Sequence, residues 1–409
     1  MVAPLDGIRV VEFANFAAAP TAVAIMADLG AEVTKVETVG GDPIRGLMRQ
    51  AKVPDDAPNP DHPFQFINRG KQSIELDLGQ PQGVEVAHRL AAESDVVVLN
   101  MLRDRRRRFG IDIDDLHAVK PDLVIGLLSG YGERGEEINR PGYDVTAFFA
   151  RSGLMSGMTM DGQVPPTPRP GQGDHTASLA FFGALMTGLR ARDVSGEGQV
   201  VEASLLRSAA FTLGLDLGIA VVDGRGTRDK PREEGLSVML QPYECADGRW
   251  LQFTMPGGGR DAWARFCTAL ERQDLIEDPR FTSGTLRYRN MAELVPEIAD
   301  AVKQRSLAEW GPLLDAQRCI WAPVNSAADA AVDPQVRAAG VFEEIHHPDA
   351  GTFDTVAAPF RLIGNDDIGV RGPAPEVGEH SEQVLRRLGY GDDEIADLAR
   401  SGVVPSAEG

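Results

Sequence analysis

The sequence contains little cysteine and lacks a metal-ligand pattern. Its three cysteines, Cys245, Cys267 and Cys319, are odd in number and far apart, and the seven histidines are scattered apart from the pair His346–His347. This spacing matches neither a disulfide framework nor a zinc site, and there is no HExxH-type motif. We therefore expect no bound metal and a reducing, cytoplasmic environment.

Several common functional motifs are also absent. The segment after the first expected strand, ANFAAAPTA (14–22), has no glycine, so the GxGxxG fingerprint of NAD-binding proteins is missing. The stretch PGGGR (256–260) lacks the Gly-Lys-Ser/Thr ending of a P-loop, and no GxSxG elbow occurs. No apolar run approaches the roughly 18 residues of a membrane span. The N-terminal residues lack the pattern of an export signal, so we expect no membrane association.

Acidic residues outnumber basic ones by 61 to 41, which gives the chain a net charge of −20. Such a surface repels nucleic acid over most of its extent, so we expect no nucleic-acid partner. The exception is RDRRRRFG (103–110), a short helical stretch rich in arginine. Most of these arginines form a solvated helix face, but one or two can meet a phosphate-bearing ligand, because guanidinium groups suit phosphate.

Alternating strand and helix patterns predict a doubly wound α/β domain over residues 1 to about 205. The expected strands are 7–13, 31–37, 73–78, 95–100, 122–132 and the start of 198–206, with helices at 20–29, 81–94 and 176–192. After a polar segment, a hairpin around Asp247-Gly248 and helices at about 261–271, 291–304 and 307–317 predict a smaller α+β domain. The tail 378–402 predicts two helices joined at Gly389–Gly391.

The segment RPGQGDHTASLAFFGAL (169–185) places Asp174 between a glycine and a histidine, where a helix is expected to begin. The local sequence favours a role for Asp174 as the helix N-cap, since Asp is among the best N-cap residues. The alternative is a covalent nucleophile, because a carboxylate can attack an activated carbonyl. Flanking glycines allow close approach, and helix-start N–H groups stabilise an oxyanion. These residues alone leave both interpretations open.

Short blocks along almost the whole chain carry a resemblance to a known family. They are PLDGIRVVEF, ADLGAEVTKVE, GGDPIRG, NRGKQSIELDL, DVVVLNM, RRFGIDIDDLHAVKPDLV, SGYGERGEEINRPGYD, GDHTAS, SGEGQVVEASLL and GEHSEQVLRRLGY. In this order they resemble the class III CoA-transferase family, the group of formyl-CoA transferase and crotonobetainyl-CoA transferase. The resemblance implies a Rossmann-like large α/β domain that binds CoA (1–215 plus 330–409) and a small α+β domain (226–322). It also implies linkers at 216–225 and 323–329 and an interlocked homodimer.

The resemblance also implies a reaction and a set of site residues. Asp174 would attack an acyl-CoA thioester and pass through aspartyl anhydride and aspartyl-CoA thioester intermediates, so that CoA moves to a small carboxylic acid. CoA is then a substrate, and no cofactor is bound permanently. The residues carried over as CoA contacts are Ala17, Ala18, Lys71, Asn100, Met101, Arg108, Phe109 and Arg140. Those carried over to the substrate pocket are Tyr143, Asp144 and His175, and Phe181 and Phe182 are expected to shape the acyl pocket.

Two alternatives share this fold. The 2-methylacyl-CoA racemases use a histidine in a Gly-His-Asp context together with the aspartate, because epimerisation needs two bases; here Tyr143 stands in place of that histidine. The other alternative is a CoA-binding subunit that is active only with a partner chain.

The sequence departs from the family at Thr38, where several members have a basic residue, and at PREEGLSVML, where formyl-CoA transferases have a glycine-rich lid. These departures weaken a prediction of formyl or oxalyl specificity.

Overall fold

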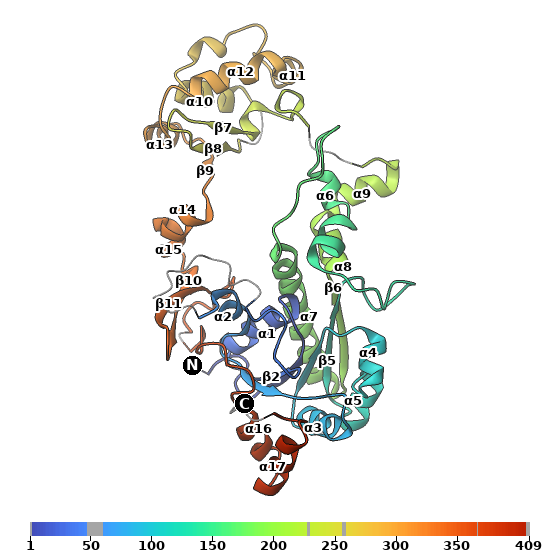
Figure 1. The fold of residues 1–409 in the computed structure, drawn as a ribbon. Helices are drawn as coiled ribbons and strands as arrows, with labels where there is room; N and C mark the ends of the chain where they lie inside the picture. Colours follow the sequence, from blue (N-terminus) through green and yellow to red (C-terminus); the bar gives the residue numbers. More distant parts are fainter. Residues whose placement is uncertain (1, 47–59, 227–229, 256–258, 366, 406–409) are drawn as a thin grey trace. The chain divides into compact units, whose positions relative to one another are not determined.

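The computed structural model describes residues 2–46, 60–226, 230–255, 259–365 and 367–405 (Figure 1). The chain divides into two compact units. The first comprises Met1–Gly157, Pro166–Thr227 and Gly340–Gly409, and the second comprises Met158–Pro165 and Arg228–Ala339. Most of the segment expected as a linker, 216–225, is the helix α9 (Gly214–Asp223) of the first unit. Most of the stretch PGGGR lies outside the described residues.

The first unit is built on six parallel strands in the order β3-β2-β1-β4-β5-β6. They are β1 (Arg9–Phe13), β2 (Glu32–Glu37), β3 (Gln72–Glu75), β4 (Val96–Leu99), β5 (Val124–Ser129) and β6 (Gln199–Ser204). Strands β4 and β5 are almost wholly apolar because a parallel sheet is covered on both faces. This sheet, with smaller antiparallel sheets elsewhere in the chain, confirms the predicted α/β fold class.

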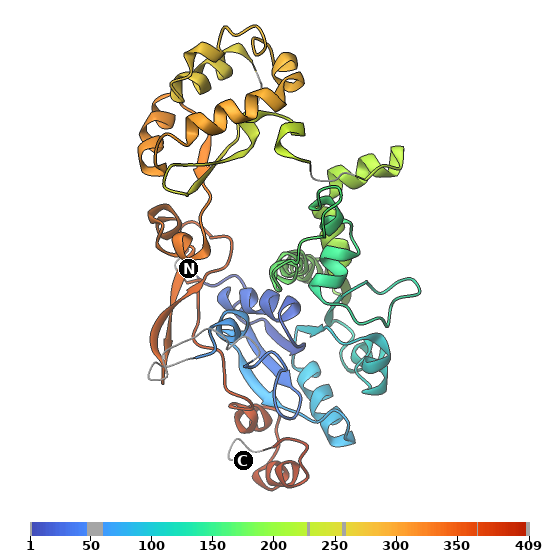
Figure 2. The same cartoon turned by 45° about the horizontal axis from the view of Figure 1, so that its top comes forward.

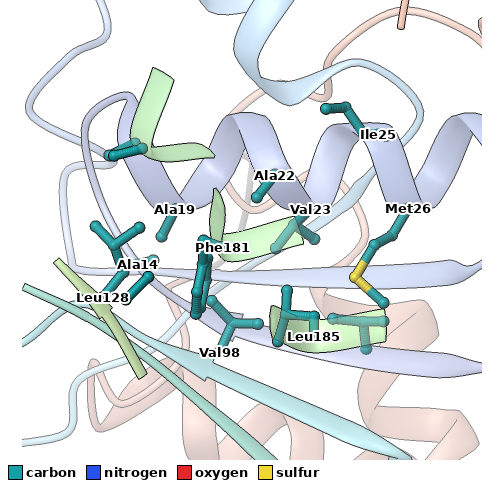
Figure 3. Packing of buried hydrophobic residues seen from close by; sticks show 14 of the residues in the cluster. Ala14, Ala19, Ala22, Val23, Ile25, Met26, Val98, Leu128, Phe181 and Leu185 are labelled. Atoms are coloured by element: carbon teal, nitrogen blue, oxygen red, sulfur yellow. The ribbon is translucent and has the colours of Figure 1, made fainter. Parts of the chain in front are cut away.

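One face of the sheet packs against α1 (Ala18–Asp28) and α7 (Gln172–Ser195), as Figure 3 shows. Since side chains alternate along a strand, Val98 points into this core while Val97 points into the core of the opposite face. Gly126 on β5 leaves room for α7, because a Cβ there would lie 2.5 Å from the Leu185 side chain. Phe181 is fully buried in the same core, so it does not shape an acyl pocket.

The opposite face packs against helices from distant parts of the chain. They are α3 (Pro81–Ala92), α5 (Ile113–Val119), α16 (Ser381–Arg387) and α17 (Asp392–Arg400). The two tail helices were predicted. The hairpin of β10 (Phe342–His347) and β11 (Gly351–Val356) was not, because its strands are half exposed and do not alternate regularly between apolar and polar residues. This hairpin lies beside α2 (His62–Asn68) in Figures 1 and 2, where His62 and Phe353 make an edge contact.

Shorter elements of the first unit connect these layers. They are α4 (Arg103–Arg108), the π-helix η1 (Asp144–Ala150), α6 (Leu154–Gly157), α8 (Leu205–Thr212) and α9. Within the described part of the chain, no single helix has the length and apolarity to cross a membrane. The adjacent helices α8 and α9 meet that test only as a pair, which is bent by 83°.

The second unit contains a three-stranded antiparallel sheet in the order β7-β8-β9. Its strands are β7 (Pro242–Glu244), β8 (Trp250–Phe253) and β9 (Trp321–Pro323), and the predicted hairpin joins β7 to β8. Trp263, Phe266 and Trp310 are buried in its core, as is each of the three cysteines. Its helices are η2 (Arg232–Glu234), η3 (Val238–Leu240), α10 (Arg260–Ala269), η4 (Gln273–Leu275), α11 (Gly284–Arg289), α12 (Met291–Val302), α13 (Leu307–Ala316), α14 (Ala327–Val332) and α15 (Pro334–Ala338).

Candidate active site

A cavity of about 240 Å³ lies at the carboxyl ends of β1, β4 and β5. In the strand order β3-β2-β1-β4-β5-β6 the chain reverses its direction of progress between β1 and β4, and the crevice at such a switch point is where doubly wound sheets bind ligands. The residues lining the cavity are Asn15, Phe16, Ala18, Asn100, Met101, Leu102, Arg105, Leu128, Ser129, Gly130, Pro141, Gly142, Tyr143, Asp174 and Leu205.

Asp174 lies in the first turn of α7, but it is not the N-cap. The helix begins at Gln172, earlier than predicted, and its N-cap is Gly171, which has a φ of 95°. Asp174 is therefore the third helical residue, in the turn whose N–H groups have no partner within the helix, and it lines the cavity. The N-cap interpretation of Asp174 is wrong, because Gly171 takes the left-handed conformation that ends the preceding loop.

Asp144 holds the start of α7 in place. One of its carboxylate oxygens accepts a hydrogen bond from Gly171 N at 2.7 Å, and the other accepts one from Val145 N at 2.7 Å. Gly173 allows η1 to pack closely against α7, because a Cβ there would lie 2.8 Å from the side chains of Asp144 and Phe148. Gly173 next to Asp174 thus allows η1 to pack tightly against the first turn of α7.

The cavity shifts the acidity of two neighbouring groups. Burial raises the pKa of the Asp174 carboxyl from its ordinary value of 3.8 to about 7, and repulsion from Asp144 adds to the rise. Burial lowers the pKa of His175, against the opposing pull of Asp144. A neutral His175 is the result near pH 7, and its ring makes an edge contact with Phe66. Perturbed groups in a cleft are typical of catalytic sites.

Five of the site residues carried over from the resemblance line the cavity: Ala18, Asn100, Met101, Tyr143 and Asp174. The side chain of Asn100 is already engaged, since it donates to Asn15 O at 2.7 Å and accepts from Asn15 N at 3.1 Å. Its role here is to hold the turn after β1. Asp144 and His175 are not among the residues that line the cavity, and Ala17 is buried in a small cluster with Ile44, Phe64, Ile67 and Ala374.

The arginine run divides into residues with different surroundings. Arg106 is buried and pairs with Asp112 and Glu133, so it has a structural role. Arg108 is exposed, with its guanidinium group 4.9 Å from the centre of the Phe109 ring. Arg105 was not singled out from the sequence, although it is the arginine of the run that lines the cavity. Arg105 precedes Arg108 by three residues, so both lie on one face of α4. This spacing is the sequence signal that could have identified Arg105 as a ligand contact.

Two further predicted contacts have other partners. Arg140 is half exposed, forms an ion pair with Glu137 and lies over the Tyr131 ring. Lys71 is fully enclosed, and its ammonium group contacts three oxygens: Glu12 Oε2 at 2.7 Å, Pro20 O at 2.8 Å and Asn68 Oδ1 at 2.9 Å. Since an ammonium group has three donors, Lys71 has none left for CoA in this structure. Burial lowers the pKa of Lys71 to about 8, although Glu12 opposes the shift.

A carboxyl group with a raised pKa, in a cavity at the switch point of a doubly wound sheet, defines an α/β protein with an enzyme-type site. Residues 5–381 match the family model described as CoA-transferase family III. The chain therefore belongs to this family and is a CoA-transferase, whose substrates are CoA thioesters and carboxylic acids.

Relatives with similar sequences support the same family over nearly their whole length. The chain is 31% identical over 404 residues to (R)-2-hydroxy-4-methylpentanoate CoA-transferase of Clostridioides difficile, covering 98% of this chain and 99% of that protein. It is 30% identical to cinnamoyl-CoA:phenyllactate CoA-transferase of Clostridium sporogenes, over 97% of this chain and 96% of that protein. Succinyl-CoA:glutarate CoA-transferase of Homo sapiens is 27% identical, over 100% of this chain and 91% of that protein.

Solved structures of similar fold agree. A CaiB/BaiF family protein from Brucella suis superposes with a TM-score of 0.82 at 26% identity, covering 95% of this chain and 100% of that chain. Rv3272 from Mycobacterium tuberculosis has a TM-score of 0.80 at 27% identity, covering 93% of this chain and 99% of that chain.

Proposed function

We propose that Asp174 is the nucleophile that carries CoA from an acyl-CoA donor to a carboxylic acid acceptor. The observation that supports this most directly is its position, since it is the carboxylate that lines the switch-point cavity. An Asp174 oxygen attacks the thioester carbonyl, the C–S bond breaks, and CoA leaves as a thiolate. The product on the enzyme is a mixed anhydride between Asp174 and the donor acyl group.

The remaining steps conserve the energy of the thioester. The thiolate attacks the carbonyl carbon of Asp174 in the anhydride and releases the donor acid, which leaves Asp174 as a CoA thioester. The acceptor carboxylate then attacks that thioester, releases the thiolate and forms a second anhydride. The thiolate finally attacks the acyl carbon of the acceptor, so that a new acyl-CoA leaves and Asp174 is again a carboxylate. No net proton, water or nucleotide is consumed.

The surroundings of Asp174 suit these steps. Each attack places negative charge on a carbonyl oxygen, and the free N–H groups at the start of α7 are fixed donors for such an oxyanion. With a pKa of about 7, the Asp174 carboxyl is largely ionised at slightly alkaline pH and is then ready to attack. Asp144 and the close packing at Gly173 fix its position before substrate arrives.

We assign the CoA contacts with this geometry in view. Ala18 and Met101 line the same cavity as Asp174 and are assigned to the reacting end of CoA. Arg105 and the exposed Arg108, together with the half-buried Phe109, form an arginine–aromatic surface on and just after α4, suited to phosphates and to an adenine ring. Ala17 and Arg140 remain proposed contacts from the resemblance, as do His175 and Asp144 for the substrate pocket. Lys71 is withdrawn from this set and is given a different role below.

We propose that the exchanged acids are small organic acids. The names of the relatives include a branched hydroxy acid, an aromatic hydroxy acid and a dicarboxylic acid. These names define a compact test panel: succinyl-CoA and cinnamoyl-CoA as donors, with glutarate, phenyllactate and 2-hydroxy-4-methylpentanoate as acceptors.

We further propose a homodimer. Helix α9 has no buried residue, and four apolar side chains on α8 and α9 are 86–87% exposed: Phe211, Leu215, Val221 and Val222. Apolar side chains grouped in this way on a surface mark an interaction site. A second copy of the chain is the partner that the resemblance implies.

The experiment that tests the nucleophile is covalent trapping. The protein is incubated with each donor CoA ester and quenched with hydroxylamine, which converts an aspartyl anhydride or thioester to a hydroxamate. We expect the hydroxamate on Asp174, release of CoA, and loss of both in Asp174→Ala. Asp122→Asn, at an exposed position, is the matched control. Exchange of the α-proton of a chiral 2-methylacyl-CoA with deuterated water, with no adduct on Asp174, would instead identify a racemase.

A further inference from the structure

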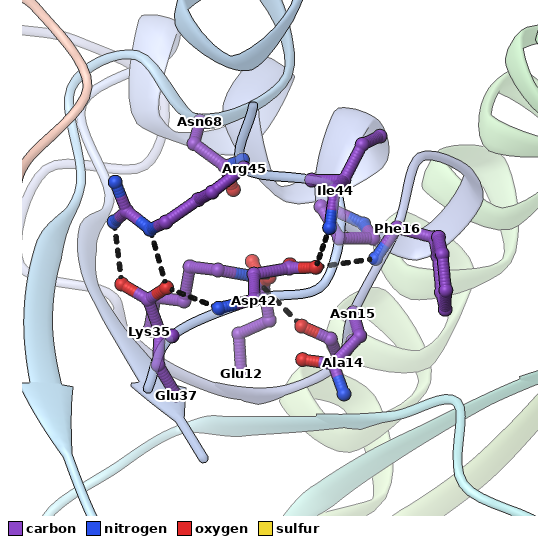
Figure 4. A network of polar contacts seen from close by, with 12 residues as sticks. Glu12, Ala14, Asn15, Phe16, Lys35, Glu37, Asp42, Ile44, Arg45 and Asn68 are labelled. Carbon is purple, nitrogen blue, oxygen red and sulfur yellow. Dashed lines mark hydrogen bonds and ion pairs between the residues drawn. The ribbon is translucent and has the colours of Figure 1, made fainter. Parts of the chain in front are cut away.

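Four charged side chains lie buried below the turn that joins β1 to α1, and the proposed chemistry uses none of them. They are Glu12 on β1, Lys35 on β2, Asp42 in the loop after β2 and Lys71 just before β3. Lys35 Nζ lies 2.9 Å from Glu12 Oε1 and 2.9 Å from Asp42 Oδ2 (Figure 4). Lys71 Nζ lies 2.7 Å from the other oxygen of Glu12. Two positive and two negative charges therefore balance inside the protein.

This buried cluster also holds the backbone of the turn. Three backbone atoms are bound: Ala14 O, which accepts from Lys35 Nζ at 2.8 Å; Phe16 N, which donates to Asp42 Oδ1 at 3.1 Å; and Pro20 O, which accepts from Lys71 Nζ at 2.8 Å. The bonds fall at the start of the turn, at its middle and just inside α1. A buried ionic network is costly to form, so its placement under one particular turn calls for an explanation.

The conformation of Phe16 provides that explanation. Its φ is 63°, in the left-handed region that a bulky residue rarely adopts, and the turn contains no glycine to take this position. A residue stays in such a conformation only when its surroundings enforce it, and strained residues of this kind cluster at functional sites. Here the Asp42 carboxylate binds the Phe16 N–H directly, and the Asn100 side chain binds both backbone groups of Asn15.

The turn between β1 and α1 forms part of the cavity wall. Phe16 and Ala18 both line the cavity. The Phe16 ring meets the Tyr143 ring edge-on, with centroids 5.4 Å apart. The Ser178 hydroxyl lies 2.6 Å from Ala18 O and 2.8 Å from Asp174 O, so it links the start of α1 to the helical turn that carries Asp174. If the turn moved, the shape of the cavity wall would change, and so would the position of that wall relative to Asp174.

We propose that Asp42, supported by Lys35, is a positioning residue that holds Phe16 in its left-handed conformation and so shapes the surface on which CoA binds beside Asp174. Lys71 has the matching role at the start of α1, in place of the direct CoA contact expected from its sequence position. Because this role concerns the same cavity, it rests on the proposed function. Lys35, Asp42 and Lys71 are not among the residues that line the cavity, so they act through the turn.

Two double variants test the oxygen of Asp42 that accepts from Phe16 N and, at 3.1 Å, from Ile44 N. Lys35→Met/Asp42→Asn and Lys35→Met/Asp42→Leu both remove one positive and one negative charge, which leaves the Glu12–Lys71 pair balanced. Asn and Leu have similar shapes, but only Asn retains an oxygen that can accept from Phe16 N. A third variant, Asp28→Asn/Arg69→Met, removes another buried ion pair of the same unit and controls for general destabilisation.

The readouts are the dissociation constant for free CoA, measured by calorimetry, and hydrogen exchange of the peptide covering residues 13–18, measured by mass spectrometry. Relative to the Asn variant, we expect CoA binding in the Leu variant to be about tenfold weaker and the peptide to exchange faster; the Asp28/Arg69 control should stay within about twofold of wild type. Equal CoA binding, or equal exchange, in the two Lys35/Asp42 double variants would overturn the proposal.

The two measurements also distinguish failure of the proposed function from failure of the positioning role. A wild-type protein that does not bind CoA contradicts the proposed function, and the exchange comparison alone then decides whether Asp42 holds the turn. Conversely, a hydroxamate on Asp174 together with equal exchange in the two double variants would leave the nucleophile established and remove the positioning role.

Discussion

Replacement of Asp174 by asparagine should stabilise the protein in a pH-dependent way. The carboxyl group is forced from an ordinary pKa of 3.8 to about 7 by burial and by Asp144. At 1.36 kcal/mol per tenfold change in proton affinity, this difference corresponds to about 4 kcal/mol. Because the side chain keeps some contact with solvent in the cavity, we expect about half of that, ~2 kcal/mol.

The sign follows from proton binding. Between about pH 4 and pH 7 the native state keeps a proton on Asp174 that the unfolded chain has lost, so the free energy of unfolding of the wild type falls as pH rises through this window. Below about pH 4 both states are protonated and the effect vanishes. The Asp174→Asn variant does not titrate at this position. It should match the wild type near pH 4 and exceed it by ~2 kcal/mol above pH 8.

The assay is urea unfolding of both proteins at several pH values from about 4.5 to 8.5, followed by circular dichroism. The quantity of interest is the difference between the variant and the wild type at each pH, because every other titrating group then cancels. The exposed substitution Asp122→Asn should show a flat difference. A stability difference for Asp174→Asn that does not change with pH would refute the view that burial of a charge, caused by the cavity, sets its pKa.

Four other results are expected. The kcat/KM of the wild type should rise with pH through about 7 and then level, since the ionised form of Asp174 attacks; a flat profile between pH 5.5 and 8.5 would contradict this. Gly173→Ala should destabilise the protein by about 1–3 kcal/mol in thermal unfolding, because its Cβ would lie 2.8 Å from neighbouring side chains. Arg105→Ala should weaken CoA binding about tenfold in calorimetry, whereas the nearby Arg107→Ala, which removes a pair with the half-buried Asp112, should not. Val222→Asp should shift the protein from dimer to monomer in sedimentation velocity; an unchanged sedimentation coefficient would exclude α9 from the interface.

The order of strands and helices was readable because local patterns carry it. The apolar runs at β4 and β5 and the helical periods of α1, α3 and α7 lie within single segments of sequence, and their positions agree with the structure to within a few residues. The β10–β11 hairpin was missed because its half-exposed strands mix polar and apolar residues without a regular alternation. The predicted start of α7 was too late because the N-cap is a glycine, whereas Asp174 is of a residue type that more often occupies the N-cap position.

The sequence by itself determined the fold class through local strand and helix patterns. Its short blocks, taken in order, carried the resemblance to the family, and that resemblance indicated the aspartate at which chemistry is proposed. Only the tertiary structure decided how individual side chains behave. It enclosed Lys71 against Glu12, a residue 59 positions away, and exposed Arg105 to the cavity while burying Arg106 next to it. The reason is that the burial and partners of a charged group are set by segments that are distant in sequence and meet only when the sheet assembles, and these decide whether the group binds a ligand, titrates or holds a turn.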